Sequence, residues 1–422
     1  MAEYYGRKCL MAKVHAVPEH VTPMPAIIDG VCQRCFCKLR GEWCLPHGAV
    51  YCWHCHQLGR VSSLDQFWWQ PEPHAFIVEQ HPCQWRGNLS VAQTRVANQL
   101  VESYQGHQSR LVYAVTGAGK TEMLYPLLNM ALKDGKRVAI VSPRVDVLLE
   151  ISRRMREAFV VSSVLLYGDS PEVYRYTQLV FATTHQLLHF WRAFDVLVVD
   201  EVDAFPYAEN PVLARTVTGA LLERGSVIYL TATPSQRLLR ACRHAEMQLS
   251  VLPRRFHGYL LPQLTIKIAT NWRKQLPHAL VKILRQYQTS GQRFLLFVPE
   301  IADLPIMKAL VAPYCLVETV HAQTKNRRAI VQAMRDEKVQ GLITTTILER
   351  GVTFAGIDVI IMGADESTFS TAAILQMAGR CGRSKERPGG LVMCIVTEKN
   401  GQVKQAYHEI AYLNRMAVKD AV

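Results

Sequence analysis

The chain has 422 residues, of which 49% are hydrophobic and 20% charged, a composition that excludes a disordered or fibrous protein and is typical of two or three globular domains. Lys and Arg number 48 against 35 Asp and Glu, which gives a formal net charge of +13 and favours an anionic partner such as nucleic acid or an acidic membrane surface. The first residues lack the apolar core of a signal peptide, and no stretch has the roughly 18 to 20 uncharged apolar residues of a membrane span, so we expect a cytoplasmic protein.

Cysteines concentrate near the N-terminus, where eight of the twelve precede residue 84. Cysteines of a reducing compartment seldom form disulfides. Two Cys-x2-Cys pairs separated by sixteen residues, Cys32 with Cys35 and Cys52 with Cys55, have the spacing of a four-cysteine zinc site. We therefore predict an N-terminal module, residues 1–80, organised by one structural Zn²⁺.

Other side chains of this module leave alternatives open. The aromatic residues Phe67, Trp68 and Trp69 either form the small core of the module, which we favour, or stack on nucleic-acid bases. Further candidate metal ligands are Cys37, Cys44, His47, His54 and His56.

Beyond a connector rich in Pro and His, residues 71–88, short apolar runs alternate with helix-like amphipathic segments. Continuous β-branched runs bounded by polar turns are typical of strands buried on both faces, so they predict parallel sheets covered by helices. Residues 249–264 have no strong period. We place a boundary there, between an α/β lobe over residues 81–250 and a second over residues 251–422. The apolar runs cover residues 137–143, 178–184, 194–200, 226–233, 293–299, 341–346, 358–363 and 389–397, enough for one large sheet or two smaller ones.

The segment AVTGAGKT, residues 114–121, lies between an apolar run and a helical pattern, the context that a phosphate-binding loop requires. Ala114 replaces the first glycine of that pattern, whereas the remaining positions fit it. We expect the backbone N–H groups of the turn to bind phosphate, Lys120 to reach the β- and γ-phosphates and the Thr121 hydroxyl to help hold Mg²⁺. The residues predicted to bind nucleotide here are Thr116, Gly117, Ala118, Gly119, Lys120 and Thr121.

The acidic segment DEVD, residues 200–203, begins at the last residue of the apolar run 194–200. Carboxylates at the C-terminal end of a parallel strand lie where α/β sheets bind ligands. Asp200 suits Mg²⁺ coordination, and the adjacent Glu201 is suited to orient and deprotonate an attacking water. Eighty residues after a phosphate loop, this pattern indicates an NTPase.

The segment QMAGRCGR, residues 376–383, is the decisive motif. On one helix, Gln376, Gly379, Arg380 and Arg383 fall on one face. Two guanidinium groups on one helix face repel each other unless they bind anions such as a triphosphate. We therefore predict Gln376, Arg380 and Arg383 as catalytic residues that stabilise charge on the transferred phosphoryl group when two lobes close.

Polar side chains follow four other predicted strands. Thr231 and Thr233 of TAT are predicted to couple the state of the γ-phosphate to lobe position. The segments SPR, ATTHQLL and TTTILERGV supply hydroxyl, backbone and Arg groups suited to contact a nucleic-acid backbone without reading its sequence. The predicted DNA-binding residues are Pro143, Arg144, Thr184, His185, Thr345 and Thr346.

This order of motifs resembles the superfamily 2 helicases and translocases over residues 89–400. The resemblance implies two RecA-like lobes with ATP and Mg²⁺ in the cleft. It places Gln93 where many members contact adenine, and Ala114 is a residue that superfamily 2 loops often carry. With its Cys-rich module, DEVDAFP and TTTILERGVTF, the chain most resembles the ComFA family of late-competence DNA-uptake ATPases.

Members of that family act on single-stranded DNA at the inner face of the membrane, so the resemblance implies an ATP-driven translocase or helicase for uptake of transforming DNA. It also implies partners among other DNA-uptake proteins, a peripheral association with the membrane and the possibility of an oligomer.

The alternative function is that of a primosomal-type replication-restart helicase, although that family places its metal module between late helicase motifs. A DEAD-box RNA helicase would read DEAD rather than DEVD. A scaffold with an inactive ATPase would have lost Lys120, Asp200, Glu201 or Arg383, and all four are present.

Overall fold

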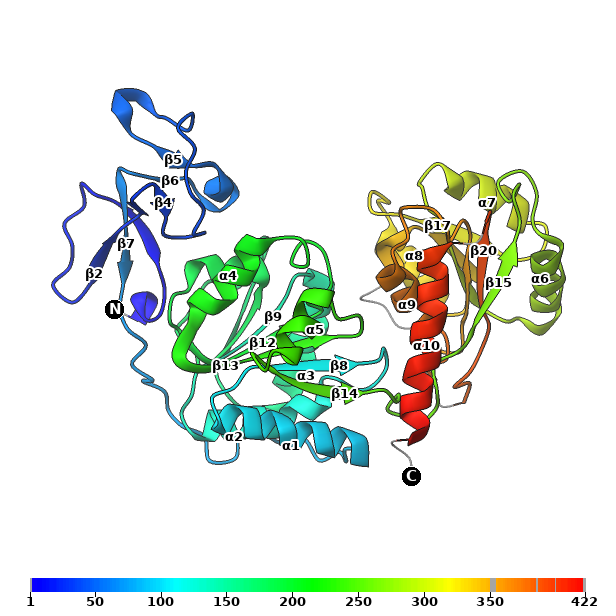
Figure 1. The fold of residues 1–422 in the computed structure, drawn as a ribbon, viewed down its shortest axis with the longest axis horizontal. Helices are drawn as coiled ribbons and strands as arrows, with labels where there is room; N and C mark the ends of the chain where they lie inside the picture. The colour runs from blue at the N-terminus through cyan, green and yellow to red at the C-terminus, as the bar shows by residue number, and fades with distance from the viewer. Residues whose placement is uncertain (1, 350–353, 385, 399, 420–422) are drawn as a thin grey trace. The chain divides into compact units, whose positions relative to one another are not determined.

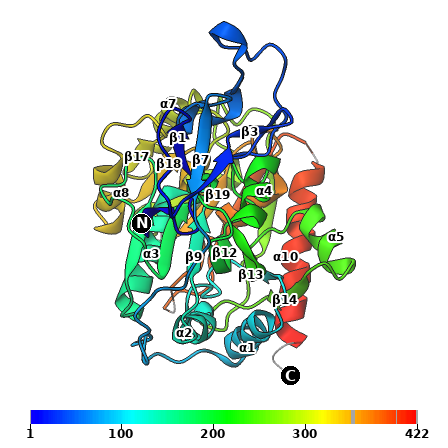
Figure 2. The same ribbon diagram turned by 90° about the vertical axis from the view of Figure 1, so that its left-hand side faces the viewer.

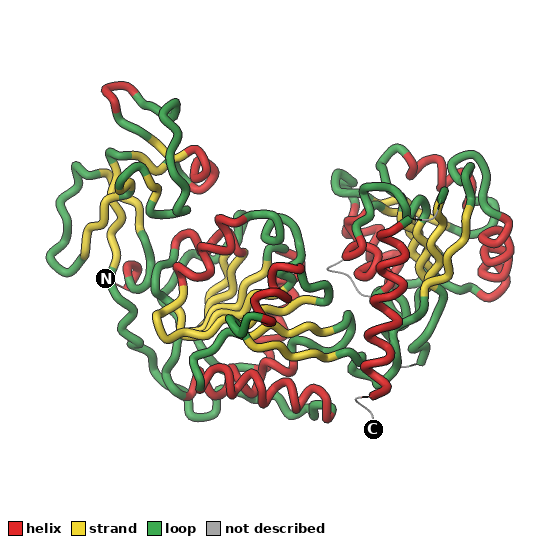
Figure 3. Tube along the Cα trace, in the orientation of Figure 1, coloured by secondary structure: helices red, strands yellow, loops and turns green. Residues whose placement is uncertain are grey.

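The protein consists of two compact units, Met1–Tyr113 with Lys120–Val251, and Ala114–Gly119 with Leu252–Val422. The computed structural model describes residues 2–349, 354–384, 386–398 and 400–419. Each unit contains its own sheet with helices packed on it (Figure 1), and Figure 3 shows the strands of each sheet side by side between helices. The α/β fold with two parallel-sheet lobes is thus confirmed, and the apolar runs divide between two sheets rather than forming one.

The sheet of the first unit has seven strands, and its hydrogen-bonded pairs are parallel from β10 through β8. Figures 1 and 2 show α1 and α2 on one side of this sheet and α4 and α5 on the other. In sheet order the strands are β10 (Ser163–Leu166), β11 (Leu179–Thr183), β9 (Val138–Ser142), β12 (Phe194–Asp200), β13 (Leu221–Thr231), β8 (Arg110–Ala114) and β14 (Gln248–Leu252). The helices are α1 (Val91–Gln105), α2 (Tyr125–Lys133), α3 (Val145–Ala158), α4 (Pro211–Ala220) and α5 (Gln236–Arg243), with the 3₁₀ turns η4 (Glu122–Leu124) and η5 (Thr184–His189).

The register of this sheet brings the ends of its central strands to one edge. Ser142 pairs with Thr183, Asp200 with Leu230 and Tyr113 with Thr231. The loops after β8, β9, β11, β12 and β13 therefore leave the sheet at the same edge, which is the ligand-binding edge of parallel α/β sheets.

The sheet of the second unit has six strands, all parallel. One core cluster joins a face of the sheet to α6 and α7, and another joins the opposite face to α8, α9 and α10. In sheet order the strands are β15 (Leu264–Ile268), β20 (Val392–Val396), β19 (Asp358–Ile361), β16 (Phe294–Phe297), β18 (Gly341–Thr344) and β17 (Val317–Val320). The helices are α6 (His278–Ser290), α7 (Asp303–Val311), α8 (Arg327–Arg335), α9 (Thr371–Ala378) and α10 (Gly401–Lys419), with the 3₁₀ turn η6 (Thr346–Leu348). Among the described residues, no helix is both long and apolar enough to span a membrane.

The N-terminal module contains only short elements around a small core. Phe67 is fully buried, Trp68 is 5% exposed, and the Trp69 indole donates from Nε1 to the Trp191 carbonyl at 3.1 Å. Phe67 and Trp68 therefore belong to the small core of the module, because buried rings cannot stack on bases, whereas Trp69 is half-buried and bonds the first lobe. The elements are η1 (Ala2–Tyr4), β1 (Cys9–Ala12), β2 (Thr22–Pro25), β3 (Ile27–Ile28), β4 (Val31–Cys32), η2 (Pro46–Gly48), β5 (Tyr51–Cys52), η3 (Trp53–Leu58), β6 (Val61–Ser62) and β7 (Asp65–Trp69).

The module packs on the turn η5 of the first lobe. The Lys8 amide donates to the His189 carbonyl at 2.7 Å, and Leu188 belongs to the same apolar cluster as the cysteines of the module. On the lobe side, the Arg215 guanidinium donates to the Phe36 carbonyl at 2.9 Å. The module is thus attached to the turn that carries Thr184 and His185.

A buried ion pair ties the connector to the first sheet. Arg137 Nη1 lies 2.7 Å from a Glu72 carboxylate oxygen, and both side chains have no exposed surface. The remaining Arg137 donors bond the Tyr5 and Thr177 carbonyls and the Tyr174 hydroxyl, at 3.0 to 3.2 Å. Each end of the pair is therefore satisfied, the condition under which a buried ion pair is tolerated.

We expect Arg137→Ala to destabilise the first unit by about 3–5 kcal/mol, because the carboxylate of Glu72 would remain buried without its counter-ion. Urea unfolding followed by tryptophan fluorescence would measure the effect. The control is Arg156→Ala, which breaks a half-exposed pair with Glu172 and should cost about 1 kcal/mol or less. Equal midpoints for the two variants would contradict the stabilising role of the buried pair.

Candidate functional site

The phosphate loop begins where β8 ends. Ala114 is fully buried as the last residue of β8, and the left-handed backbone positions of the loop are Gly117, at φ 79°, and Gly119, at φ 74°. Glycine adopts a positive φ without the steric cost that other residues incur there. Because Ala114 lies in a strand rather than at such a position, the absence of the first glycine of the pattern carries no conformational cost.

The helix after the loop begins later than the sequence pattern suggests. Residues Glu122–Leu124 form a 3₁₀ turn, and α2 starts at Tyr125 with Pro126 in its first turn. Proline has no N–H, and its ring clashes with the carbonyl four residues earlier. Pro126 therefore prevents a regular α-helical turn from extending back to Thr121.

Lysine and carboxylates meet at the edge of the first sheet. Lys120 Nζ lies 3.4 Å from Glu201 Oε1 and 3.9 Å from Asp200 Oδ1, and the three side chains are between 9% and 15% exposed. The pKa of Asp200 is raised to about 6, mainly by burial. The Lys120 ammonium acts to lower this pKa, and the Glu201 carboxylate acts to raise it. Within the described part of the chain, Asp200 Oδ1 has no hydrogen-bond donor. A buried carboxylate oxygen left open in this way fits a site for a hard cation such as Mg²⁺.

Glu201 has a left-handed backbone, with φ 54°. Positive φ is uncommon for residues other than glycine, costs of the order of 1–3 kcal/mol and persists where the surroundings fix it. Here it turns the chain sharply after β12 and directs the Glu201 carboxylate toward Lys120. Strain at this residue is consistent with a functional position.

Asp203 joins the acidic segment to the TAT segment. Its carboxylate accepts hydrogen bonds from the Thr231 hydroxyl, at 2.6 Å, and from the Thr233 hydroxyl. The sequence placed both threonines at the end of β13 but gave Asp203 no role. A carboxylate after a strand often only caps a turn, so the sequence did not indicate the partners of Asp203. The pairing of β12 with β13 places Thr231 and Thr233 within its reach.

The predicted DNA-binding residues of the first lobe lie at the same sheet edge. Arg144 follows β9, and its guanidinium bonds Asp146 at 3.1 Å. Thr184 is fully buried in η5, and its Oγ1 has no hydrogen-bond partner among the described residues. Burial lowers the pKa of the neighbouring His185. Pro143 is half-buried beside Arg144.

The candidate residues of the second unit lie at the ends of two of its elements. Thr345 and Thr346 follow β18 and are half-buried, whereas Arg350, Gly351 and Val352 of TTTILERGV lie outside the described residues. Gln376 is 2% exposed within α9.

The prediction of one helix face for Gln376, Gly379, Arg380 and Arg383 is wrong, because α9 ends at Ala378. Gly379 caps the helix, and Gly382 has φ 69°, a conformation that ends helices. Arg380 Nε and Nη2 instead donate to the Glu349 carbonyl at 2.8 and 2.6 Å, and Arg383 Nε donates to the Gly379 carbonyl at 3.0 Å. Both arginines are thus held by backbone oxygens in a turn.

Gln93 lies at the start of α1 and is 6% exposed. Ser90 is the N-cap, and its side chain accepts from the Gln93 amide while Gln93 Oε1 accepts from the Ser90 amide at 2.9 Å. This is a reciprocal capping box. The structure therefore gives Gln93 a helix-capping contact, and its contact with adenine stays a prediction.

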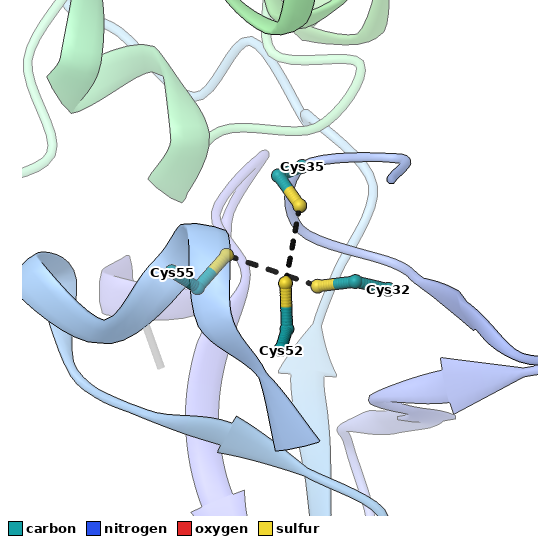
Figure 4. A group of neighbouring side chains, drawn as sticks. All are labelled: Cys32, Cys35, Cys52 and Cys55. Atoms are coloured by element: carbon teal, nitrogen blue, oxygen red, sulfur yellow. Dashed lines mark hydrogen bonds between the residues drawn. The ribbon is translucent and has the colours of Figure 1, made fainter. Parts of the chain in front are cut away.

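The four predicted zinc ligands converge on one point. Figure 4 shows Cys32, Cys35, Cys52 and Cys55 pointing toward each other from two turns, and their sulfurs all lie within 4.8 Å of one another. The Sγ atoms are 3.8 Å apart between Cys32 and Cys55 and 3.5 Å apart between Cys35 and Cys52. A tetrahedral site with Zn–S bonds near 2.3 Å requires a separation of about 3.8 Å, so the residues fit the metal.

The alternative ligands lie outside this cluster. The Cys37 thiol faces the Cys35 carbonyl at 3.8 Å, and Cys44 is exposed. The rings of His54 and His56 pack against Trp43 and Trp53. Among the described residues, the group of side chains suited to hold a metal ion is the four cysteines.

Two buried cations lie beside the four sulfurs. The Lys8 ammonium donates to the Gln33 carbonyl at 2.7 Å, and the Arg34 guanidinium donates to the Leu58 and Gly59 carbonyls. Burial lowers the pKa of Lys8 to about 7, whereas the nearby cysteines raise it. Four thiolates around one Zn²⁺ would carry a net charge of −2, which cations at these positions would compensate.

Comparison with known proteins assigns the fold and the family. The DEAD/DEAH box helicase family matches residues 90–241, and the helicase conserved C-terminal domain matches residues 275–385. The chain is 37% identical to the competence protein ComFA of Streptococcus pneumoniae over 92% of this chain and 90% of that protein, and 37% identical to ComFA of Bacillus subtilis over 88% and 81%. The chain belongs to the ComFA family.

Solved structures of helicases have the same fold. Saccharomyces cerevisiae Dbp5 bound to RNA and ADP–BeF₃ matches 77% of this chain and 92% of its own with a TM-score of 0.54 and 16% identity. The DEAD-box helicase Mss116 bound to single-stranded RNA matches 76% and 77% with a TM-score of 0.57 and 17% identity. At this identity the likeness concerns the fold alone. The family and the two helicase domains identify a competence-related, ATP-dependent helicase of superfamily 2 that uses ATP and Mg²⁺ and binds nucleic acid.

Proposed function

We propose that the protein is an ATP-driven translocase on single-stranded DNA that imports transforming DNA during natural competence, at the inner face of the cell membrane and with other DNA-uptake proteins. The observation that carries the proposal is the cluster of Lys120, Asp200 and Glu201 within 4 Å, at the sheet edge that also bears Arg144 and Thr184. The family of the relatives named above supports the competence role.

In this proposal Lys120 binds the β- and γ-phosphates, and the backbone N–H groups of Thr116 to Gly119 surround the β-phosphate. Bound Mg²⁺, held by Thr121 and Asp200, would neutralise charge on the phosphates. The Lys120 ammonium is shared with Glu201, so a phosphate that takes over this ammonium leaves the Glu201 carboxylate to orient and deprotonate water.

Asp203, bonded to both Thr231 and Thr233, ties the acidic segment to the coupling threonines. Gln376, Arg380 and Arg383 as catalytic residues, and Thr345 and Thr346 as DNA contacts, are part of the same proposal. The four cysteines are proposed to hold one structural Zn²⁺.

Phosphate release titrated with single-stranded DNA, double-stranded DNA and RNA tests the substrate class. We expect single-stranded DNA to stimulate ATP hydrolysis most, because a translocase couples hydrolysis to the strand along which it moves. Stimulation by RNA alone would contradict the proposal. Stimulation by forked duplex above single strands would favour the restart-helicase alternative.

Salt dependence tests the phosphate contacts. For six to ten contacts, affinity for single-stranded DNA should fall steeply, by roughly 10²–10⁴ between 50 and 200 mM salt. Arg144→Ala should weaken binding equally for all sequences and reduce the magnitude of the slope of log K against log salt by about one. The control Arg153→Ala removes an exposed arginine of α3 that pairs with Glu150 and Glu157, and should leave the slope unchanged. Fluorescence anisotropy would measure both, and a flat salt response would argue against backbone binding.

A further inference from the structure

Arg154 of helix α3 reaches across to the end of the phosphate loop. Its Nη1 donates to Thr121 Oγ1 at 3.1 Å, and its Nη2 donates to a carboxylate oxygen of Glu122. The Arg154 side chain is 35% exposed and that of Glu122 is 20% exposed. One guanidinium thus binds two consecutive residues more than thirty positions away in the sequence.

The neighbouring arginine behaves differently. Arg153 is 59% exposed and pairs with Glu150 and Glu157, three and four residues away on the same helix, at 3.0 and 2.6 Å. Such pairs are ordinary surface contacts of a helix. Among the described residues Arg154 has no comparable ion pair within α3, and its hydrogen bonds go to the segment after the loop.

The chemistry of the Thr121 hydroxyl gives this contact a consequence. A guanidinium has donors and no acceptor, so Thr121 Oγ1 accepts from Arg154 with one of its two lone pairs. A Mg²⁺ held by Thr121 would use the other lone pair, so the guanidinium and the metal would lie next to each other on one oxygen. The guanidinium also places a full positive charge beside the position of the metal, and like charges disfavour each other's binding.

We propose that Arg154 competes with Mg²⁺ for Thr121 Oγ1 and thereby sets the magnesium concentration at which nucleotide binds tightly. The inference rests on the proposed function, because Thr121 is a metal ligand only if the loop binds nucleotide. Arg154 is a positioning residue in this scheme. Glu122 holds its guanidinium at the hydroxyl, so the metal must bind beside an anchored cation.

Binding of the fluorescent analogue N-methylanthraniloyl-ADP, titrated with Mg²⁺ from an EDTA solution, tests the competition without measuring hydrolysis. In Arg154→Ala, the Mg²⁺ concentration for half-maximal tightening should fall roughly fivefold, the effect of one hydrogen bond. Affinity in EDTA should stay within about twofold of wild type, because the competition acts only on the metal. Arg154→Gln, which keeps a donor but removes the charge, should give an intermediate fall.

The matched control is Arg153→Ala, for which we expect the magnesium dependence of wild type. Thr121→Ala should weaken the magnesium effect on nucleotide affinity, because one of the two proposed metal ligands is lost. Adding Arg154→Ala to it should lower the magnesium requirement by less than Arg154→Ala does alone, since the hydrogen-bonded oxygen is gone and only the effect of the charge remains. Thermal unfolding of each variant checks that it is folded.

An unchanged or higher magnesium requirement in both Arg154 variants would overturn the inference. So would weaker nucleotide binding in EDTA, which would make Arg154 a direct phosphate ligand or a support of the loop. Wild-type protein that binds the analogue without any magnesium dependence would instead overturn the proposed metal site, and the inference with it.

Discussion

Lys120→Ala is expected to lower kcat for ATP hydrolysis by roughly 10²–10³, the loss found when one group that stabilises transition-state charge is removed. Glu201→Gln should lower kcat by a similar factor, because the amide cannot accept the proton of the attacking water. The two variants should differ in binding. Lys120→Ala loses a phosphate contact and should bind nucleotide more weakly, whereas Glu201→Gln should keep or gain affinity, since the Lys120 ammonium no longer pairs with a carboxylate.

Phosphate release with saturating single-stranded DNA measures kcat, and nucleotide affinity is measured separately. Lys133→Ala is the control for the lysine, because Lys133 is exposed on α2, the helix that follows the same loop. Lys120→Ala and Glu201→Gln proteins that hydrolyse ATP at the wild-type rate would refute the assignment of this site and leave a nucleic-acid-binding scaffold as the remaining interpretation.

Cys32→Ser with Cys35→Ser is expected to abolish binding of about one zinc per chain and to unfold the N-terminal module. Structural zinc contributes of the order of 10–16 kcal/mol of binding free energy to small domains, and this module has few other buried apolar residues. Elemental analysis gives the zinc content. Limited proteolysis should show cleavage within residues 1–70 of the variant while the first lobe stays protected.

The control for the zinc site is Cys37→Ser with Cys44→Ser, which removes two cysteines outside the cluster and should retain zinc. A folded, zinc-loaded Cys32→Ser/Cys35→Ser protein would eliminate the four-cysteine site. Leu188 of η5 packs with the same cluster. If Thr184 and His185 of η5 contact DNA as proposed, loss of zinc should also weaken DNA binding. Unchanged DNA affinity would show that the module does not support η5.

The strands that sequence patterns identified are the central ones. The four that they missed, β10, β14, β15 and β17, are the edge strands of the two sheets. Central strands of a parallel sheet are covered on both faces and require continuous apolar runs, whereas an edge strand such as β15 exposes Lys267 and Ile268. A short strand with polar positions has no periodicity that separates it from a loop.

The residues proposed to be catalytic could be named from the sequence because phosphate and metal chemistry needs fixed residue types in a fixed order. The error at Arg380 and Arg383 has a local cause. The four residues share a helix face only if the helix continues through Gly379 and Gly382, and Gly382 adopts a left-handed backbone that stops a helix.

The sequence by itself determined the class of the fold, the four converging cysteines and the polar residues at the strand ends, because each follows from local chemistry or from spacing along the chain. Only the tertiary structure decided the division into two sheets, the attachment of the N-terminal module to η5, the bonds of Asp203 to Thr231 and Thr233, and the contact of Arg154 with Thr121. These depend on which distant segments the register and packing bring together, and the type of a residue does not indicate a partner that lies between 28 and 179 positions away.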